Sequence, residues 1–160
     1  MNQDEIFARM IECVDFYKFL SARSEPTGSS EYGIGNPADY DRFCTKENFD
    51  AIVTEAGNMY LEVIPSASAY ACVERSVNII VHTKIFHIFV VKEYDINPFR
   101  LATAATAQMC MTYPLAGAVK AMRVQYFRSV RDMAMMWGSL LVSGLKTKNV
   151  AVEDGKVGAA

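Results

Sequence analysis

The chain has 160 residues, of which 51% are hydrophobic and 21% are charged. This composition excludes a disordered chain, which would hold fewer apolar residues and more net charge, and it predicts one globular domain. A formal net charge of −2 gives the whole molecule no electrostatic reason to bind nucleic acid or an anionic membrane.

The first predicted element is a helix over residues 3–22, where apolar side chains recur at steps of three and four from Ile6 to Leu20. Its acidic start predicts neither a signal peptide nor a transit peptide. Residues 23–37 carry two prolines and three glycines and show no periodicity. They predict a long polar loop, and loops of that length are usually functional or disordered.

A second helix is predicted over residues 38–63, with a later start at Thr45 as the alternative. A third helix is predicted over residues 66–97, which contain no glycine or proline. The β-branched run from Val77 to Val91 could instead form a pair of strands, but it has no turn signal, and its length favours one helix. The most apolar segment, Ile79 to Val91, is too short to span a membrane and is interrupted by His82, Lys84 and His87.

Asn97-Pro98 predicts the start of the next helix, because a side-chain cap followed by proline is a common helix N-terminus. A break at residues 112–114 separates it from a last helix over 114–145. The elements together predict an all-α fold, a bundle of four to five helices with the long polar loop at about 23–37. The single domain spans residues 1–148, and residues 149–160 form an extended C-terminal arm.

The charges are unevenly distributed along the chain. Residues 1–62 hold twelve acids and five bases, a net of −7, while residues 63–160 hold six acids and eleven bases, a net of +5. Either the two parts pack on each other inside one monomer, or complementary faces meet head-to-tail between copies. The four cysteines include no closely spaced pair, so we expect no disulfide framework and a reducing compartment.

No pattern in the sequence is typical of a catalytic, cofactor or metal site. His82 and His87 would stand about 140° apart on a helix and on opposite faces of a strand, so a shared metal ion is not expected. The carboxylate pairs are interpreted as a solvated helix face, and they are Asp39 with Asp41 and Glu47 with Asp50. We therefore predict no catalytic residue, no metal and no cofactor, in a chain that is not an enzyme.

The last predicted helix carries the pattern on which the functional hypothesis depends. One side is an apolar stripe, formed by Val119, Met122, Tyr126, Val130, Met133, Trp137 and Leu140. Roughly opposite lie the bases Lys120, Arg123, Arg128 and Arg131. The segment from Met133 to Trp137 is apolar almost all round, so we expect Met133, Met135, Met136 and Trp137 to be covered by another subunit.

The predicted function is that of a structural subunit that forms homo-oligomers through helical faces and arms. By analogy of size and parts, it suits a viral or phage component such as a head–tail connector ring protein, bound to itself and to other proteins of the same assembly. The alternative is a nucleic-acid-binding helical protein that uses the basic face of the last helix. An enzyme acting through Cys72 or Cys110 is least favoured. We expect the chain in the cytoplasm or in a virion.

Overall fold

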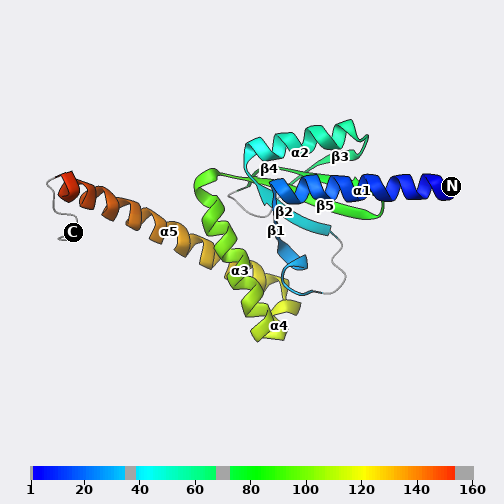
Figure 1. The fold of residues 1–160 in the computed structure, drawn as a ribbon. Coiled ribbons are helices and arrows are strands. Elements are labelled where there is room, and N and C mark those ends of the chain that lie inside the picture. The colour runs from blue at the N-terminus through cyan, green and yellow to red at the C-terminus, as the bar shows by residue number, and fades with distance from the viewer. Residues whose placement is uncertain (1, 35–38, 68–72, 154–160) are drawn as a thin grey trace.

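The computed structural model describes residues 2–34, 39–67 and 73–153, with side chains as far as Gly138. Its centre is a five-stranded mixed sheet with helices on both faces (Figure 1). The prediction of an all-α bundle is therefore wrong, and the fold is α/β. The errors lie in the middle of the chain, where one predicted helix is a strand at both ends and the next is mostly a pair of strands.

The N-terminal helix is confirmed. Helix α1 spans Gln3–Arg23 and begins with a capping box, in which Asn2 and Glu5 each accept a hydrogen bond from the other's backbone N–H. Its C-terminal end is fixed to the body, because the buried Arg42 guanidinium donates to the side chain and the carbonyl of Ser24 at 2.6 and 2.9 Å. Burial lowers the pKa of Arg42 from its ordinary value.

The predicted loop at 23–37 is ordered over much of its length. It contains strand β1, Glu25–Thr27, and a short 3-10 helix η1, Gly28–Ser30, while residues 35–37 lie outside the described part of the chain. The predicted helix over 38–63 is wrong at both ends, where strand β2 spans Asp39–Cys44 and strand β3 spans Glu62–Ser66. Between them, helix α2 spans Lys46–Asn58 with Thr45 as its N-cap, so the later start is confirmed.

The predicted third helix is a β-hairpin. Strand β4, Val73–Val81, pairs with strand β5, Lys84–Val91, and residues 68–72 lie outside the described part of the chain. The turn between them places His82 at a φ of 55°, a conformation that hairpin turns usually give to asparagine or glycine. The hairpin therefore has no standard turn signal, and its alternating burial at Val77, Ile79 and Val81 has the period of a strand.

The C-terminal part is helical, as predicted. A 3-10 helix η2, Glu93–Asp95, precedes helix α3, Ile96–Thr112, and the break at Tyr113 leads into the short helix α4, Pro114–Ala118. The last helix begins later and ends later than predicted, because α5 spans Lys120–Glu153. Residues 149–153 of the predicted arm are thus helical, and residues 154–160 lie outside the described part of the chain.

The strands lie in the order β1-β2-β5-β4-β3, with β2 parallel to β5 and the other neighbours antiparallel. The two edge strands, β1 and β3, each contain a proline, Pro26 and Pro65. One sheet face packs on α1 and α2. On the other face, Phe43, Phe89 and Val91 pack against Phe99 of α3 and Phe127 of α5; all five are at most 2% exposed.

Two helices extend beyond this body in different directions (Figure 1). The N-terminal half of α1 passes the end of the sheet, and only Phe16 and Leu20 in its C-terminal half are buried. The C-terminal half of α5 leads away from the sheet on another side. No helix in the described ranges is both long enough and apolar enough to cross a membrane.

Candidate functional site

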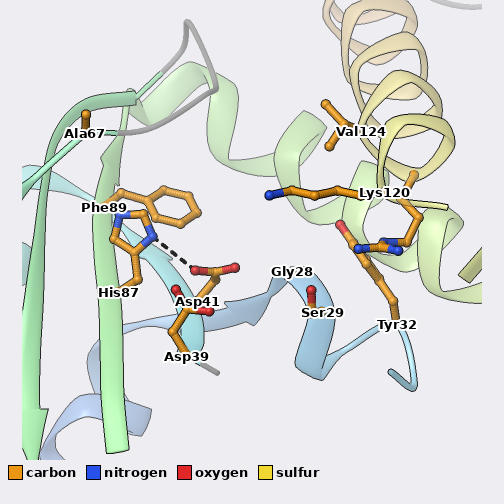
Figure 2. Close-up of a pocket in the computed structure, with 11 residues that line it drawn as sticks. Gly28, Ser29, Tyr32, Asp39, Asp41, Ala67, His87, Phe89, Lys120 and Val124 are labelled. Carbon is orange, nitrogen blue, oxygen red and sulfur yellow. Dashed lines mark hydrogen bonds and ion pairs between the residues drawn. The ribbon is translucent and has the colours of Figure 1, made fainter. Parts of the chain in front are cut away.

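A cleft of about 300 Å³ opens on the sheet face that carries α3 and α5. Its floor is formed by side chains of β2 and β5, and its opposite wall by η1 and the first turns of α5 (Figure 2). The apolar part of this sheet face, around Phe43 and Val91, is covered by Phe99 and Phe127. The cleft lies at the other end of the same two strands, where their side chains are polar.

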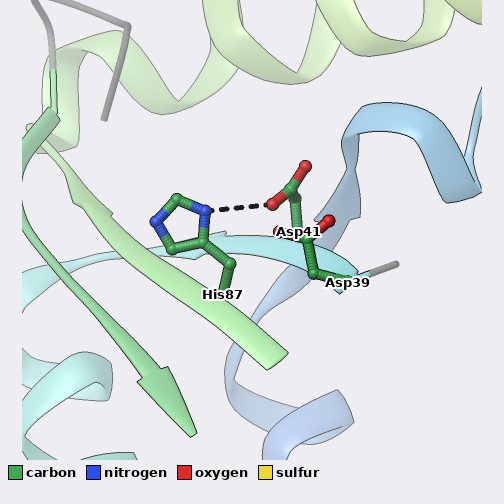
Figure 3. Close-up of side chains that lie close together, drawn as sticks. All are labelled: Asp39, Asp41 and His87. Carbon is green, nitrogen blue, oxygen red and sulfur yellow. Dashed lines mark hydrogen bonds and ion pairs between the residues drawn. The ribbon is translucent and has the colours of Figure 1, made fainter. Parts of the chain in front are cut away.

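Three of these polar side chains form a cluster, Asp39, Asp41 and His87 (Figure 3). Asp39 and Asp41 are two residues apart on β2 and so point to the same face of the sheet. The parallel pairing of β2 with β5 sets His87 directly beside Asp41. His87 Nδ1 lies 3.1 Å from Asp41 Oδ1, and one ligand atom from each of the three residues lies within 4.8 Å of the others.

The cluster is half-buried, with 16% of the His87 side chain and 25% of the Asp41 side chain exposed. The interpretation of Asp39 and Asp41 as a solvated helix face is therefore wrong, because both lie on a strand that lines a cleft. His82 lies in the exposed β4–β5 turn and is not part of the cluster. Glu47 and Asp50 are on α2 and are exposed.

The two ring nitrogens of His87 have different surroundings. Nε2 is closed to solvent and has no hydrogen-bond partner among the described residues, and the ring contacts the edge of Phe89 at 5.4 Å between centroids. Nδ1 faces Asp41 (Figure 3). A histidine that activates a serine or cysteine must present its second nitrogen to the nucleophile, and here that nitrogen is enclosed.

Gly28 in η1 packs against the Asp41 carboxyl group near Oδ2, while Oδ1 faces His87. Its φ is +74°, and a Cβ atom there would lie 3.0 Å from both Cβ and Cγ of Asp41 and still closer to its carboxylate. Only glycine adopts this conformation without strain and leaves room for the Asp41 side chain. The contact therefore links the predicted loop to the cluster on the sheet.

We expect Gly28→Ala to displace Asp41 and to break its hydrogen bond to His87. Gly33→Ala is the matched control, because Gly33 has a φ of +73° but no atom within 4 Å of an added Cβ. Both variants should lose about 1–3 kcal/mol to backbone strain. Only Gly28→Ala should move the imidazole nitrogen resonances of His87 in NMR spectra, and equal spectra for the two variants would contradict the contact.

The opposite wall of the cleft is cationic. The exposed side chain of Lys120 extends across the cleft toward the sheet (Figure 2). Arg123 also lines the cleft, but it is 9% exposed and donates a hydrogen bond to the carbonyl of Gly117. Among the described residues, neither Asp39 nor Asp41 forms an ion pair with a lysine or an arginine.

The bases of α5 do not form one solvated strip. Arg131 donates to the buried Asp95 at 3.1 Å and to Asp132 at 2.7 Å, and Arg123 is buried. Lys120 and Arg128 are the exposed members of the predicted set. The buried face of α5 runs through Phe127, with Arg123 on the same side, so two of the predicted surface bases are part of the interior contacts of this helix.

The predicted apolar stripe of α5 is largely exposed instead. Trp137 is 64% exposed, Met136 is 55% exposed and Met133 is 53% exposed, while Met135 is half-buried. Val119 and Met122 at the start of the stripe are also about half exposed, and Leu140 lies outside the described side chains. The helix thus turns part of its apolar surface to solvent, and the cover of this segment by another subunit stays a prediction.

The described thiols are poor nucleophiles. Burial raises the pKa of Cys44 to about 12, and burial also raises the pKa of Cys110 and Cys13 from their ordinary values. A reactive cysteine needs a lowered pKa and access to solvent. Cys72, the other predicted candidate for a nucleophile, lies outside the described residues.

No protein-family model, no curated protein and no solved structure matches this chain. The residues of the chain itself present two features that bear on its function. One is the cleft with its cluster of two carboxylates and an imidazole. The other is the exposed apolar surface on the two projecting helices.

Proposed function

We propose that this chain is a subunit of a homo-oligomer in which neighbouring copies cover apolar surfaces on α1 and α5. The observation that carries the proposal is the exposed apolar face of the N-terminal half of α1. This α1 patch consists of Ile6, Phe7, Met10, Ile11 and Val14, which are 46–66% exposed. Scattered apolar residues on a surface need no explanation, but a contiguous apolar patch marks an interaction site.

The α1 patch follows the helix in a regular stripe, since its members are separated by steps of one, three and four residues. At about 100° per residue, Ile6 and Met10 lie on the side of α1 where Leu20 packs on the sheet, whereas Phe7, Ile11 and Val14 lie more than about 100° away from Leu20. Most of the α1 patch therefore faces away from the sheet, and the contacts of Phe16 and Leu20 leave it uncovered. Covering each large apolar side chain is worth about 1.5–3 kcal/mol, before the cost of association.

A second copy fits as the partner, because the chain presents a second apolar surface elsewhere. This α5 patch consists of Met133, Met136 and Trp137, and it lies on the segment of α5 that leads away from the sheet (Figure 1). When two different surfaces of one chain meet, the interface is heterologous. Such interfaces generate rings if the rotation closes and filaments if it does not.

Charge supports the same pairing. Residues 1–62, which include α1, carry a net charge of −7, and residues 63–160, which include α5, carry a net charge of +5. Asp4 and Glu5 lie beside the α1 patch in the first turn of the helix, while Lys120 and Arg128 are exposed on α5. Complementary charge steers two surfaces together and suppresses the pairing of like with like.

The viral or phage connector ring is one assembly that a heterologous interface can build, and it remains an analogy of size and parts. The analogy was drawn for a helical bundle, whereas the fold contains a five-stranded sheet. We therefore propose a homo-oligomer formed through the α1 and α5 patches, without naming the type of assembly. Nucleic-acid binding gains no support, because Arg123 and Arg131 are engaged inside the fold and fewer bases are left for phosphate contacts.

Two double variants test the assembly. We expect Phe7→Glu with Met10→Glu, and separately Met133→Glu with Trp137→Glu, to weaken self-association on the order of 100-fold or more, since residues central to an interface often contribute about 2 kcal/mol each. Size-exclusion chromatography with light scattering on the full chain measures the mass. Leu115→Glu on α4 is the control, because Leu115 is 84% exposed and belongs to neither patch.

Mixing the two double variants distinguishes an interface between the α1 and α5 patches from one between two α1 patches. Each keeps one intact patch, so a heterologous interface predicts a discrete dimer in the mixture and monomers in either variant alone. If α1 pairs with α1, the Met133→Glu, Trp137→Glu variant will still dimerise by itself, and the α5 patch has no role. A monomeric parent chain at high concentration would overturn the proposal.

A further inference from the structure

We propose that Asp39, Asp41 and His87 bind one divalent transition-metal ion, of the class of Mn²⁺ or Zn²⁺, at the floor of the cleft. This site is independent of the proposed assembly, since none of its residues belongs to the α1 or α5 patch.

The spacing of the donor atoms suits a shared ion. Zinc is bound at about 2.0–2.2 Å by histidine nitrogen and carboxylate oxygen. Two such ligands that meet at an ion at about 90–110° are therefore separated by about 3.0–3.4 Å. His87 Nδ1 and Asp41 Oδ1 are 3.1 Å apart, and the Asp39 carboxylate lies within 4.8 Å of both. Asp39 completes the three ligands when its carboxylate oxygen also lies about 3.0–3.4 Å from the other two donor atoms.

Among the described residues, no ion pair with a lysine or an arginine balances the charge of the cluster. Two carboxylates share a half-buried position, and like charges at such a separation disfavour each other. Within the described ranges, the only ion-pair partner of Asp41 is His87, and Asp39 has none. By contrast, the buried Asp95 is paired with Arg131. A bound cation would supply the missing charge at Asp39 and Asp41.

The three side chains are held by rigid elements. Asp41 and His87 are register partners on neighbouring strands, and Gly28 leaves Asp41 little freedom on its other side. His87 is fixed by the enclosure of Nε2 and by the ring of Phe89. Ligands that are already positioned lose little conformational entropy when an ion binds, which favours a site over a chance meeting of surface acids.

The donor set selects the class of ion, and the cleft provides open coordination positions. Imidazole suits zinc and other transition metals, while carboxylates also suit manganese and magnesium. One nitrogen with two carboxylates therefore favours Mn²⁺ or Zn²⁺ over Mg²⁺ and Ca²⁺. Three protein ligands leave further positions that face the cleft, where Lys120 extends toward the cluster. Water or an anionic group can occupy them. Coordination through Nδ1 places the proton of the neutral imidazole on Nε2.

Titration of the full chain with MnCl₂ or ZnCl₂, followed by calorimetry and by the EPR signal of free Mn²⁺, tests the site. We expect saturable binding of one ion per chain. Asp39→Asn, Asp41→Asn and His87→Ala should each weaken binding at least about ten-fold, as the loss of a ligand or of its support does at metal sites. His82→Asn is the matched control, since it removes the other histidine at the exposed turn, and it should bind as the parent does.

Circular dichroism melts of every variant confirm that each is folded before its affinity is compared. Absence of saturable binding in the folded parent chain overturns the proposal. So does binding that His87→Ala leaves unchanged, because that result assigns the ion to surface carboxylates. Equal binding of MgCl₂ and MnCl₂ also contradicts it, since the imidazole then makes no contribution. None of these outcomes bears on the oligomer, whose test is the mass of the patch variants.

Discussion

Phe127→Ala is expected to lower the free energy of unfolding by about 3–5 kcal/mol, the usual cost of removing a fully enclosed phenylalanine. The Phe127 side chain is 0% exposed, and its ring lies 4.7 Å from that of Phe99 in an edge contact. Together with Phe43 and Phe89, these rings hold α3 and α5 on the sheet. Denaturant unfolding followed by circular dichroism measures the loss.

Tyr126→Ala is the matched control for Phe127→Ala. It removes a neighbouring aromatic ring from the same helix, but Tyr126 is 37% exposed, so we expect a loss of about 1 kcal/mol or less. If the two variants lose equal stability, Phe127 does not anchor α5. A large loss for Phe127→Ala alone shows that α5 is attached to the sheet through this one ring and its neighbours.

Arg131→Met is expected to cost about 3–5 kcal/mol at neutral pH, because it leaves the buried carboxylate of Asp95 without its cation. Arg131 donates to Asp95 at 3.1 Å, and 3% of the Asp95 side chain is exposed. Methionine preserves much of the apolar length of arginine, so the loss reports mainly the charge. The same denaturant unfolding experiment provides the measurement.

Asp132→Asn tests whether the exposed carboxylate partner of Arg131 contributes to stability as the buried one does. Asp132 is 65% exposed and accepts from Arg131 at 2.7 Å, and exposed pairs contribute about 0–1 kcal/mol. We therefore expect little change in stability. A loss equal to that of Arg131→Met would place the important contact at the surface rather than at Asp95.

The sequence predicted the helices whose signals are local in the chain. The apolar steps of α1 and the Asn97-Pro98 start of α3 are local, and both helices lie where expected to within a few residues. Strand β2 was missed because its six residues, Asp39–Cys44, lie between a polar loop and a strong helix cap. The β4–β5 hairpin was missed because His82 takes the turn position where asparagine or glycine is the usual signal.

The cluster in the cleft could not be predicted from local sequence. Asp41 and His87 are 46 residues apart, and only the parallel pairing of β2 with β5 brings them together. The strand pairing could not be predicted once both segments were interpreted as helices. The one local hint was the alternation of Asp39, Tyr40 and Asp41, which sets two acids on one face of a strand.

Two of the four bases on α5, Arg123 and Arg131, face the interior, where the amphipathic pattern did not place them, and the reason is physical. An amphipathic pattern assumes that apolar residues face the interior and that bases face solvent. Asp95 lies buried at the N-terminus of α3 and pairs with Arg131, which places this base on the inner side of α5. Tertiary pairing of this kind depends on a residue 36 positions away, and periodicity carries no information about it.

The prolines in the two edge strands limit how copies of this chain can join. Pro26 and Pro65 remove a backbone donor from β1 and β3, and proline at an edge discourages another chain from extending the ladder. The sheets of neighbouring copies therefore cannot readily pair edge to edge into a continuous cross-β fibre. In the proposed homo-oligomer, contacts made by projecting helices would instead form and separate while each protomer stays folded, and growth of that assembly would be reversible.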